Sequence, residues 1–404
     1  MTTSRDVRDS SSQGHPSPTS ERPRLGRRSV LAGGAALVAG AGLLDPARAS
    51  ATTAPRGAAP IRSARTSHLS PAQQVGQRVI WSYPGRVLPT ALLDAIRAGL
   101  VGGVIFFGEN IDRNNRNQIQ AVTRDLAAAQ SDSGVGYPLL LMTDQEGGVV
   151  QRLPGAPGIT ERQMGDSLHP VDTARSMGTG AALDLLDAGV NCNLAPVLDV
   201  YREAGNFDDT FGRSYSMDPH VCGRCGAASI SAQQELGVVT TAKHFPGLGA
   251  AAANENTDLG AVVLDVSKTD LRAVDELPFR RAIAADVDMV MTSWATYPAL
   301  DPDLPAGISP TIVKGELRRR LSFRGVTITD AIEAGALAAF GDTGERAVRA
   351  AAAGMDIVLC SARDVTQGQD AVDALEAAVA DGRLDPGDAK DALQRVLSMR
   401  GRLG

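Results

Sequence analysis

The hydrophobic positions of this chain are concentrated in eight short apolar runs, and longer mixed segments separate these runs. Short apolar runs of this kind, bounded by polar or turn-forming residues, are typical of buried strands. The pattern therefore predicts eight strands between residues 77 and 360. They cover Gln77–Trp81, Gly102–Phe107, Pro138–Thr143, Asn191–Ala195, Val238–Ala242, Met289–Ser293, Gly325–Thr329 and Asp356–Cys360.

The segments between the runs have the periodicity of amphipathic helices. Strands that alternate with helices predict a parallel α/β fold, and a closed barrel of eight strands leaves no edge exposed. We therefore expect a (β/α)8 TIM barrel with a single catalytic domain, and an open doubly wound sheet is the second possibility. The helical segments include Pro89–Leu100, Arg116–Gln130, Val171–Ala188, Pro219–Leu236, Asp270–Ala285 and Gly344–Ala353.

Polar residues follow five of the apolar runs. In a TIM barrel the catalytic groups lie at the carboxyl ends of the strands, so a barrel predicts this repeated placement. No Gly-x-Gly-x-x-Gly follows the first run, which gives a dinucleotide site little support. The polar strand ends are Asp144–Gly148, Asp199, Lys243-His244, Ser293-Trp294 and Asp330.

One of these ends is especially informative, because Lys243 and His244 are adjacent and a Pro/Gly turn, Phe245–Gly249, follows them. A cation and an imidazole placed together where a buried strand ends indicate an enzyme pocket rather than a linker.

Composition fits a folded enzyme, with 43% hydrophobic and 21% charged residues. We expect the barrel domain over residues 69–404 and a linker over 50–68.

Residues 1–49 resemble a twin-arginine signal peptide, because Arg27-Arg28 precede a short apolar run and Ala47-Arg48-Ala49. That run, Val30–Leu44, is shorter than the roughly 20 residues that span a bilayer. The prediction is therefore a secreted protein without an integral membrane segment in its mature part.

Net charge argues against nucleic acid as a partner. Residues 1–49 hold seven Lys+Arg and four Asp+Glu, which leaves 33 positive and 42 negative residues in the mature part, a net charge of −9. Such a surface repels phosphate backbones.

The four cysteines give little sign of a metal centre. Cys192 and Cys360 lie in apolar strands and are expected to be buried thiols. Cys222 and Cys225 form a Cys-x-x-Cys pair that has no second pair to complete a metal site, so packing on a helix face or a local disulfide is expected. There is no His-Glu-x-x-His motif, and we expect no metal and no cofactor.

Five segments together resemble the ordered motifs of glycoside hydrolase family 3, in particular its single-domain β-N-acetylhexosaminidases. The resemblance runs from about Ser70 to the end of the chain and is specific, since all five motifs occur in the family's order. They are Asp144–Arg152, Leu194–Val200, Gly212–Ser216, Lys243–Gly247 and Val326–Ala331.

The resemblance implies a retaining O-glycosyl hydrolase that cleaves terminal β-linked N-acetylglucosamine, as in peptidoglycan or chitin fragments, through a covalent glycosyl-enzyme. Asp330 matches the catalytic nucleophile of the family. Charged groups at a barrel rim can orient sugar hydroxyls through charge-assisted hydrogen bonds. The residues that match the family's sugar-binding positions are Asp144, Arg152, Arg213, Lys243 and His244.

The chain departs from the family at its general acid/base, which is a His paired with an Asp two residues earlier. Counting without a gap places Asn256 and Asn254 at these two positions. An amide cannot exchange a proton near neutral pH. Glu255 is therefore the expected acid/base, with Asp258 as the other candidate on the same loop. The alternative is a catalytically impaired barrel that acts as a carbohydrate-binding or cell-wall-sensing protein.

Overall fold

The computed structural model describes residues 66–403. The expected signal peptide, 1–49, and most of the expected linker, 50–68, lie outside the described residues. No helix in the described part is long and apolar enough to cross a membrane.

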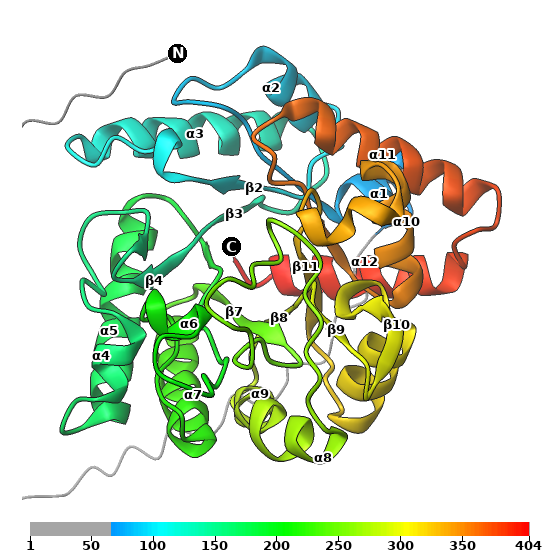
Figure 1. Cartoon of the computed structure of the whole chain (residues 1–404). Helices are drawn as coiled ribbons and strands as arrows, with labels where there is room; N and C mark the ends of the chain where they lie inside the picture. Colours follow the sequence, from blue (N-terminus) through cyan, green and yellow to red (C-terminus); the bar gives the residue numbers. More distant parts are fainter. Residues whose placement is uncertain (1–65, 404) are drawn as a thin grey trace, which may run out of the picture. The chain divides into compact units, whose positions relative to one another are not determined.

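Eight parallel strands close into a barrel, in the order β1-β12-β11-β8-β7-β6-β3-β2 (Figure 1). Each of the eight expected strands overlaps one barrel strand, so the (β/α)8 fold is confirmed and the open sheet is excluded. The strands are β1 (Val79–Trp81), β2 (Gly103–Phe106), β3 (Leu140–Thr143), β6 (Cys192–Asn193), β7 (Val239–Phe245), β8 (Met289–Thr292), β11 (Val326–Ala331) and β12 (Ile357–Leu359).

Helices follow the barrel strands and surround the sheet (Figure 1). Where the sequence predicts one helix over 270–285, the structure has a short helix, a π-helical turn and a longer helix in succession. The longer helices are α2 (Thr90–Arg97), α3 (Arg116–Asp132), α5 (Pro170–Asp187), α7 (Pro219–Glu235), α9 (Glu276–Ala284), α10 (Thr343–Ala353), α11 (Val365–Ala380) and α12 (Pro386–Arg400). The shorter segments are α1 (Pro71–Gly76), α4 (Glu161–Gly165), α6 (Phe207–Thr210), α8 (Lys268–Asp270), the 3-10 turns η1 (Gly108–Asn110), η3 (Ala306–Ile308) and η5 (Gly335–Phe340), and the π-helical η2 (Leu271–Asp275) and η4 (Thr311–Arg320).

Two short antiparallel ribbons extend from barrel strands. The first pairs β4 (Gln145–Gly147) with β5 (Val150–Gln151) directly after β3, and the second pairs β9 (Thr296–Tyr297) with β10 (Asp301–Pro305) after β8. Both ribbons start at the carboxyl ends of barrel strands. They therefore build up the rim on which a TIM barrel carries its active site.

The interior of the barrel is packed with side chains from all eight strands. Alternate strand residues point inward, so Ile80 and Ile105 lie in this layer, while their neighbours Val79 and Val104 lie in the other large cluster, with residues of the surrounding helices. Val396 and Met399 of α12 join the interior layer. The barrel is thus a filled core rather than a channel, and its chemistry is confined to the rim.

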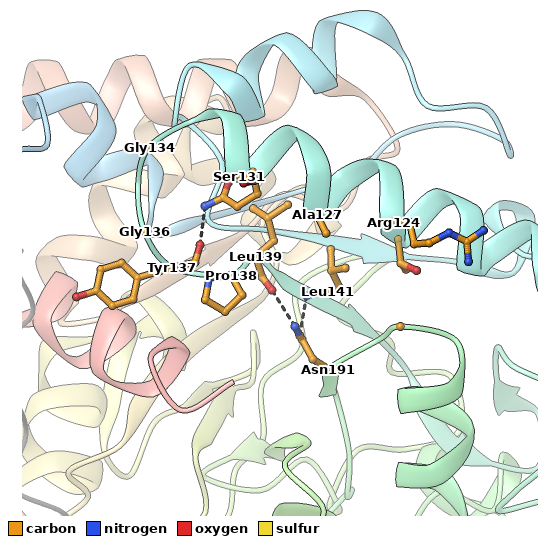
Figure 2. A pocket seen from close by; sticks show the side chains of 13 residues that line it. Arg124, Ala127, Ser131, Gly134, Gly136, Tyr137, Pro138, Leu139, Leu141 and Asn191 are labelled. Carbon is orange, nitrogen blue, oxygen red and sulfur yellow. Dashed lines mark hydrogen bonds between the residues drawn. The ribbon is translucent and has the colours of Figure 1, made fainter. Parts of the chain in front are cut away.

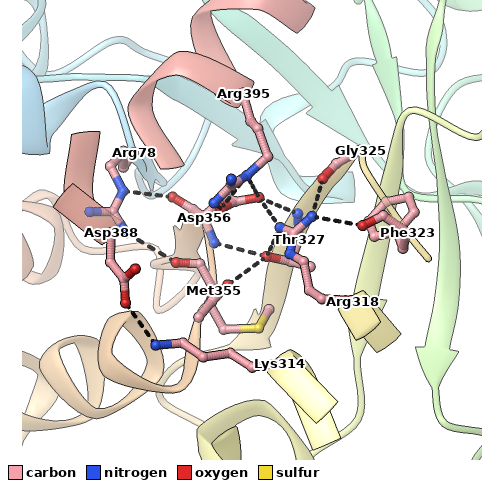
Figure 3. Close-up of polar contacts among 11 residues, drawn as sticks. Arg78, Lys314, Arg318, Phe323, Gly325, Thr327, Met355, Asp356, Asp388 and Arg395 are labelled. Atoms are coloured by element: carbon pink, nitrogen blue, oxygen red, sulfur yellow. Dashed lines mark hydrogen bonds and ion pairs between the residues drawn. The ribbon is translucent and has the colours of Figure 1, made fainter. Parts of the chain in front are cut away.

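A buried ionic cluster joins the amino ends of β11 and β12 (Figure 3). The carboxylate of Asp356 pairs with Arg318 and with Arg395, whose Nη2 lies 2.8 Å from Oδ1, and it accepts the backbone N–H of Thr327 at 2.9 Å. Arg78 donates to the Asp356 carbonyl at 2.9 Å. Burial alone would raise the pKa of Asp356, but the two arginines lower it below its ordinary value. This cluster joins β11 and β12 to η4 and α12 at the end opposite to the rim.

Candidate active site

The charged residues expected at the rim come from the carboxyl ends of different strands. Asp144 follows β3, and Glu146 lies in the β4 ribbon that continues it. Lys243 and His244 are the fifth and sixth residues of β7, and Asp330 is near the end of β11. Because parallel strands end on the same side of a closed sheet, residues almost 200 positions apart in the sequence reach one surface.

Lys243 is the centre of a buried ionic network. Its Nζ lies 2.8 Å from Oδ1 of Asp144 and 2.7 Å from Oε1 of Glu146. Arg213 donates two hydrogen bonds to the same Glu146, from Nε at 2.8 Å and from Nη2 at 2.9 Å. Arg152 lies further out, with Nη2 3.8 Å from Oδ2 of Asp144. Four of the five expected sugar-binding residues therefore belong to one connected cluster.

Glu146, Lys243 and Arg213 keep their charge at neutral pH. Burial would raise the pKa of Glu146, but Arg213 and Lys243 hold it at about 2. Burial lowers and the two carboxylates raise the pKa of Lys243, and the net shift is upward. The site therefore presents fixed cations and anions, which can bind hydroxyl groups through charge-assisted hydrogen bonds.

His244, the fifth expected residue, is held by a buried aspartate. Its Nδ1 lies 2.6 Å from Oδ2 of Asp199, and Oδ1 of Asp199 accepts the backbone N–H groups of His244 at 3.2 Å and Leu248 at 2.6 Å. Burial lowers the pKa of His244, but Asp199 outweighs this effect and the net shift is upward. Asp199 therefore holds both the imidazole of His244 and the turn after β7.

Asp330 is half-buried at the end of β11. Its Oδ1 accepts the backbone N–H of Ala331 at 2.7 Å. The negative charge of Asp330 contributes to raising the pKa of both His244 and Asp258, so these three groups share one electrostatic environment. Lys243 and Arg213 each form an ion pair with Glu146.

The loop after β7 contains the two asparagines and both candidate acids. The Oε2 of Glu255 accepts the backbone N–H of Ala252 at 2.7 Å, so this carboxylate is engaged within its own loop. The Oδ1 of Asn256 accepts the backbone N–H of Asp258 at 2.8 Å. Burial and the charge of Asp330 raise the pKa of Asp258 above its ordinary value.

The sequence assigned no role to three further carboxyl groups, which are Glu146 within the network and the buried Asp208 and Glu161. Glu146 lies within the Asp144–Arg152 motif, but only the structure joins it to Lys243 and Arg213. Asp208 in α6 is fully buried, and burial together with the charge of Asp199 raises its pKa to about 7. Glu161 accepts the backbone N–H of Val197 at 3.0 Å, and burial raises its pKa well above the ordinary value. No local motif marks Asp208 or Glu161, because only the fold brings them under the rim.

A cavity of about 580 Å³ lies away from the rim, between α3 and the amino ends of β3 and β6 (Figure 2). Its walls are mainly apolar and include Tyr137, Pro138 and Leu139. The Asn191 side chain crosses one side of it, bonding to the backbone of Leu139 and Leu141 at 2.9 Å each. Because this end of a TIM barrel serves stability rather than catalysis, the charged rim is the better candidate for the active site.

All four cysteines are buried and free. Cys222 and Cys225 lie in α7, where burial raises the pKa of each thiol to about 12. They pack on a helix face and form no disulfide. Within residues 66–403, no group of three or more His, Cys, Asp or Glu side chains is arranged to hold a metal ion.

Comparison with known proteins agrees with this geometry. Residues 87–399 match the glycosyl hydrolase family 3 N-terminal domain. An uncharacterized secreted glycosyl hydrolase of Arthroderma benhamiae is 46% identical over 82% of this chain and 94% of its own length. A β-hexosaminidase of Nitrosomonas eutropha is 34% identical over 64% of this chain and 73% of its own length.

Solved structures give the same result. The β-N-acetylhexosaminidase of Beutenbergia cavernae matches with a TM-score of 0.75 and 35% identity, over 82% of this chain and 99% of that one. A family 3 β-N-acetylglucosaminidase of Paenibacillus matches with a TM-score of 0.77 and 32% identity, over 83% of this chain and 63% of that longer chain. The resemblance found in the sequence is thereby confirmed: this chain belongs to glycosyl hydrolase family 3, as an O-glycosyl hydrolase similar to the β-hexosaminidases of that family.

Proposed function

We propose that this protein is a retaining hydrolase that removes terminal β-linked N-acetylglucosamine from peptidoglycan or chitin fragments. The observation that carries the proposal is the position of Asp330, a half-buried carboxylate on the same rim as the ionic network around Lys243. The names of the Beutenbergia and Paenibacillus relatives support an amino-sugar glycoside as the substrate.

In this proposal the network binds the sugar. Asp144, Lys243 and His244 line the barrel end, and Arg152 and Arg213 approach from the loops. Their charges are paired before the substrate arrives, so binding needs little reorganisation of the site. Sugar hydroxyls both donate and accept, and a mixed set of carboxylates and cations can therefore fix one orientation of the ring.

Asp330 acts as the nucleophile. One of its carboxylate oxygens bonds to the anomeric carbon as the glycosidic bond breaks, and water later hydrolyses the glycosyl-enzyme. The hydrogen bond from the Ala331 N–H to Oδ1 orients the carboxylate. This reaction needs a proton donor for the leaving group, and Glu255 is the donor that the sequence pattern favours.

A second candidate function is carbohydrate binding without efficient turnover. The two asparagines Asn254 and Asn256 favour it, because they occupy the positions of the family's acid/base pair. Loss of acid/base catalysis typically lowers a rate by about 10²–10⁴-fold.

Export is part of the proposal. Residues 1–49 have the features of a twin-arginine signal, and the Arthroderma relative is called secreted. Cell-wall or chitin fragments are substrates that an exported enzyme can reach.

The test is a burst experiment with an activated aryl N-acetyl-β-glucosaminide, whose departure needs little protonation. We expect one equivalent of aryl alcohol per protein molecule in a fast phase, because a covalent glycosyl-enzyme accumulates. Asp330→Asn should abolish both the burst and the later turnover. Sugar binding by the wild-type protein without any release of aryl alcohol would instead support the carbohydrate-binding function.

A further inference from the structure

The loop that follows β7 is attached to the segment that follows β11, the strand that carries Asp330. The N–H of Gly335 donates to the carbonyl of Asp258 at 2.9 Å, and the N–H of Ala336 donates to the carbonyl of Thr257 at 3.0 Å. Gly335 comes only five residues after Asp330 in the chain. These two hydrogen bonds therefore place Asp258 beside the segment that positions the nucleophile.

Close approach of the two loops depends on the absence of a side chain at Gly335. A Cβ atom there would lie 2.6 Å from the carbonyl carbon and oxygen of Leu259 and 2.9 Å from the carbonyl oxygen of Asp258. A Cβ atom cannot lie this close to other heavy atoms, and the atoms in its way belong to the backbone, which cannot move aside as a flexible side chain could. The glycine thus allows the loop after β7 to lie directly against the loop after β11.

The Asp258 side chain is accessible to solvent, but its carboxyl group senses the charges of the sugar site. Burial, Asp330 and Glu333 raise its pKa, whereas His244 and Arg213 lower it, and the net shift is upward. These four groups come from β7, β11 and the loops around them. The carboxyl group of Asp258 therefore lies within electrostatic range of the nucleophile and of two expected sugar-binding residues.

Asn256 supports this position of Asp258. Its Oδ1 accepts the backbone N–H of Asp258 at 2.8 Å, which forms a tight turn within the loop. Glu255, by contrast, uses one carboxylate oxygen to accept the N–H of Ala252. The amide that stands at the position of the family's histidine thus helps to place another acid, two residues later.

We propose that Asp258 is the general acid/base of this enzyme. The inference rests on the proposed hydrolase function and supplies the proton donor that Asn254 and Asn256 cannot provide. In the first step an Asp330 oxygen bonds to the anomeric carbon, the glycosidic C–O bond breaks, and its electron pair takes the proton of the Asp258 carboxyl. In the second step the Asp258 carboxylate takes a proton from water, the water oxygen bonds to the anomeric carbon, and the bond to Asp330 breaks.

Two carboxyl groups in one site can take the separate roles of nucleophile and general acid/base. A general acid must hold its proton near neutral pH while the nucleophile is ionised, and a neighbouring negative charge favours the protonated form of the acid. The raised pKa of Asp258 suits the role of the acid. After glycosylation the charge on Asp330 is lost, so Asp258 gives up its proton more readily and can act as a base.

The test compares Asp258→Asn with the wild-type protein on two substrates. With an N-acetylglucosamine disaccharide, the variant should lose about 10²–10⁴-fold in kcat/KM, because the leaving group needs its proton. With an activated aryl glycoside, the variant should keep its burst but turn over slowly, because water attack now lacks a base. Sodium azide, a nucleophile that needs no base, should restore turnover and yield the β-glycosyl azide.

Asp265→Asn is the matched control, because Asp265 is an exposed aspartate further along the same segment. It should behave like wild type and should not respond to azide. Disaccharide cleavage that survives Asp258→Asn, or the absence of any azide effect, would overturn the inference. Loss of disaccharide cleavage in Glu255→Gln, with Asp258→Asn still active, would assign the proton to Glu255 instead. Failure of wild-type protein to give an aryl burst would count against the proposed function itself.

Discussion

Lys243 and Glu146 form an ion pair that is almost closed to solvent: Nζ lies 2.7 Å from Oε1, and the side chains are 3% and 2% exposed. Each of the two charges has a second partner. Lys243 also contacts Asp144, and Glu146 also accepts two hydrogen bonds from Arg213. A buried ion pair of this kind stabilises the folded protein only while all of its charged partners are present. The sugar site and part of the stability of the rim thus depend on the same residues.

We expect Glu146→Gln to lower the free energy of unfolding by about 3–5 kcal/mol at pH 7, because it leaves Lys243 and Arg213 with too little negative charge. Arg213, Lys243 and burial together give Glu146 a pKa of about 2, below its ordinary 4.5. The stability it contributes is therefore complete above about pH 4.5 and is lost as the pH falls toward 2. Urea unfolding at pH 7 and pH 3 measures both effects, with the exposed Glu345→Gln as control. Equal losses in the two variants would contradict the prediction.

Asp208 should have the opposite pH dependence. Burial and the charge of Asp199 raise its pKa to about 7, so the folded protein holds a proton that the unfolded chain releases near pH 4. The contribution of Asp208 to stability is therefore most favourable below about pH 4 and declines by about 1.4 kcal/mol per pH unit up to about pH 7. Asp208→Asn removes the ionisable group and should raise the thermal midpoint relative to wild type at pH 8, with a much smaller difference at pH 5. A variant that is less stable than wild type at pH 8 would disprove this account.

Asp199 controls the protonation of His244. Burial disfavours the imidazolium, but the Asp199 carboxylate 2.6 Å from Nδ1 reverses this effect and raises the pKa of His244. Asp199→Asn should therefore lower that pKa, which NMR titration of the imidazole protons can follow. In the wild-type protein the stabilisation from this pair is complete below the ordinary pKa of about 6.5 and is lost as the pH rises through the raised value. An unchanged His244 titration in the variant would mean that Asp199 acts on the backbone alone.

The fold was predictable because each barrel strand is a separate apolar run. Strands such as Met289–Thr292 are buried on both faces, and their hydrophobicity does not depend on knowing the partner strand. The split of the expected helix over 270–285 into α8, η2 and α9 was not predictable, because amphipathic periodicity does not distinguish an α-helix from a π-helical turn.

The candidate site was predictable only where its residues lie in strand-end motifs. Lys243 and Asp330 follow apolar runs and could be placed at the rim from the sequence. Asp208 and Glu146 acquire their importance from charges that are distant in the sequence, such as Arg213 for Glu146. The importance of Asp258 could not be predicted either, because its position depends on hydrogen bonds from Gly335 and Ala336, which follow β11.

Arg152 is the residue of the network whose removal should affect binding more than folding. Its side chain is 29% exposed, and its one ion pair, to Asp144, is long at 3.8 Å. Its Nε is nevertheless buried and has no hydrogen-bond partner among the described residues. A buried donor without a partner is costly, and a sugar hydroxyl can supply the missing acceptor.

We therefore expect Arg152→Ala to weaken binding of N-acetylglucosamine by about 1.5–3 kcal/mol, the scale of a hydrogen bond to a charged group. Its free energy of unfolding should fall by less than about 1 kcal/mol, because a long and partly exposed ion pair contributes little. Calorimetric titration and urea unfolding measure the two quantities on the same samples. Arg86→Ala, which removes an arginine with a 54% exposed side chain, should change neither. If Arg152→Ala bound the sugar as tightly as Arg86→Ala, the unpaired Nε would have no role in recognition and the sugar would have to sit closer to Arg213.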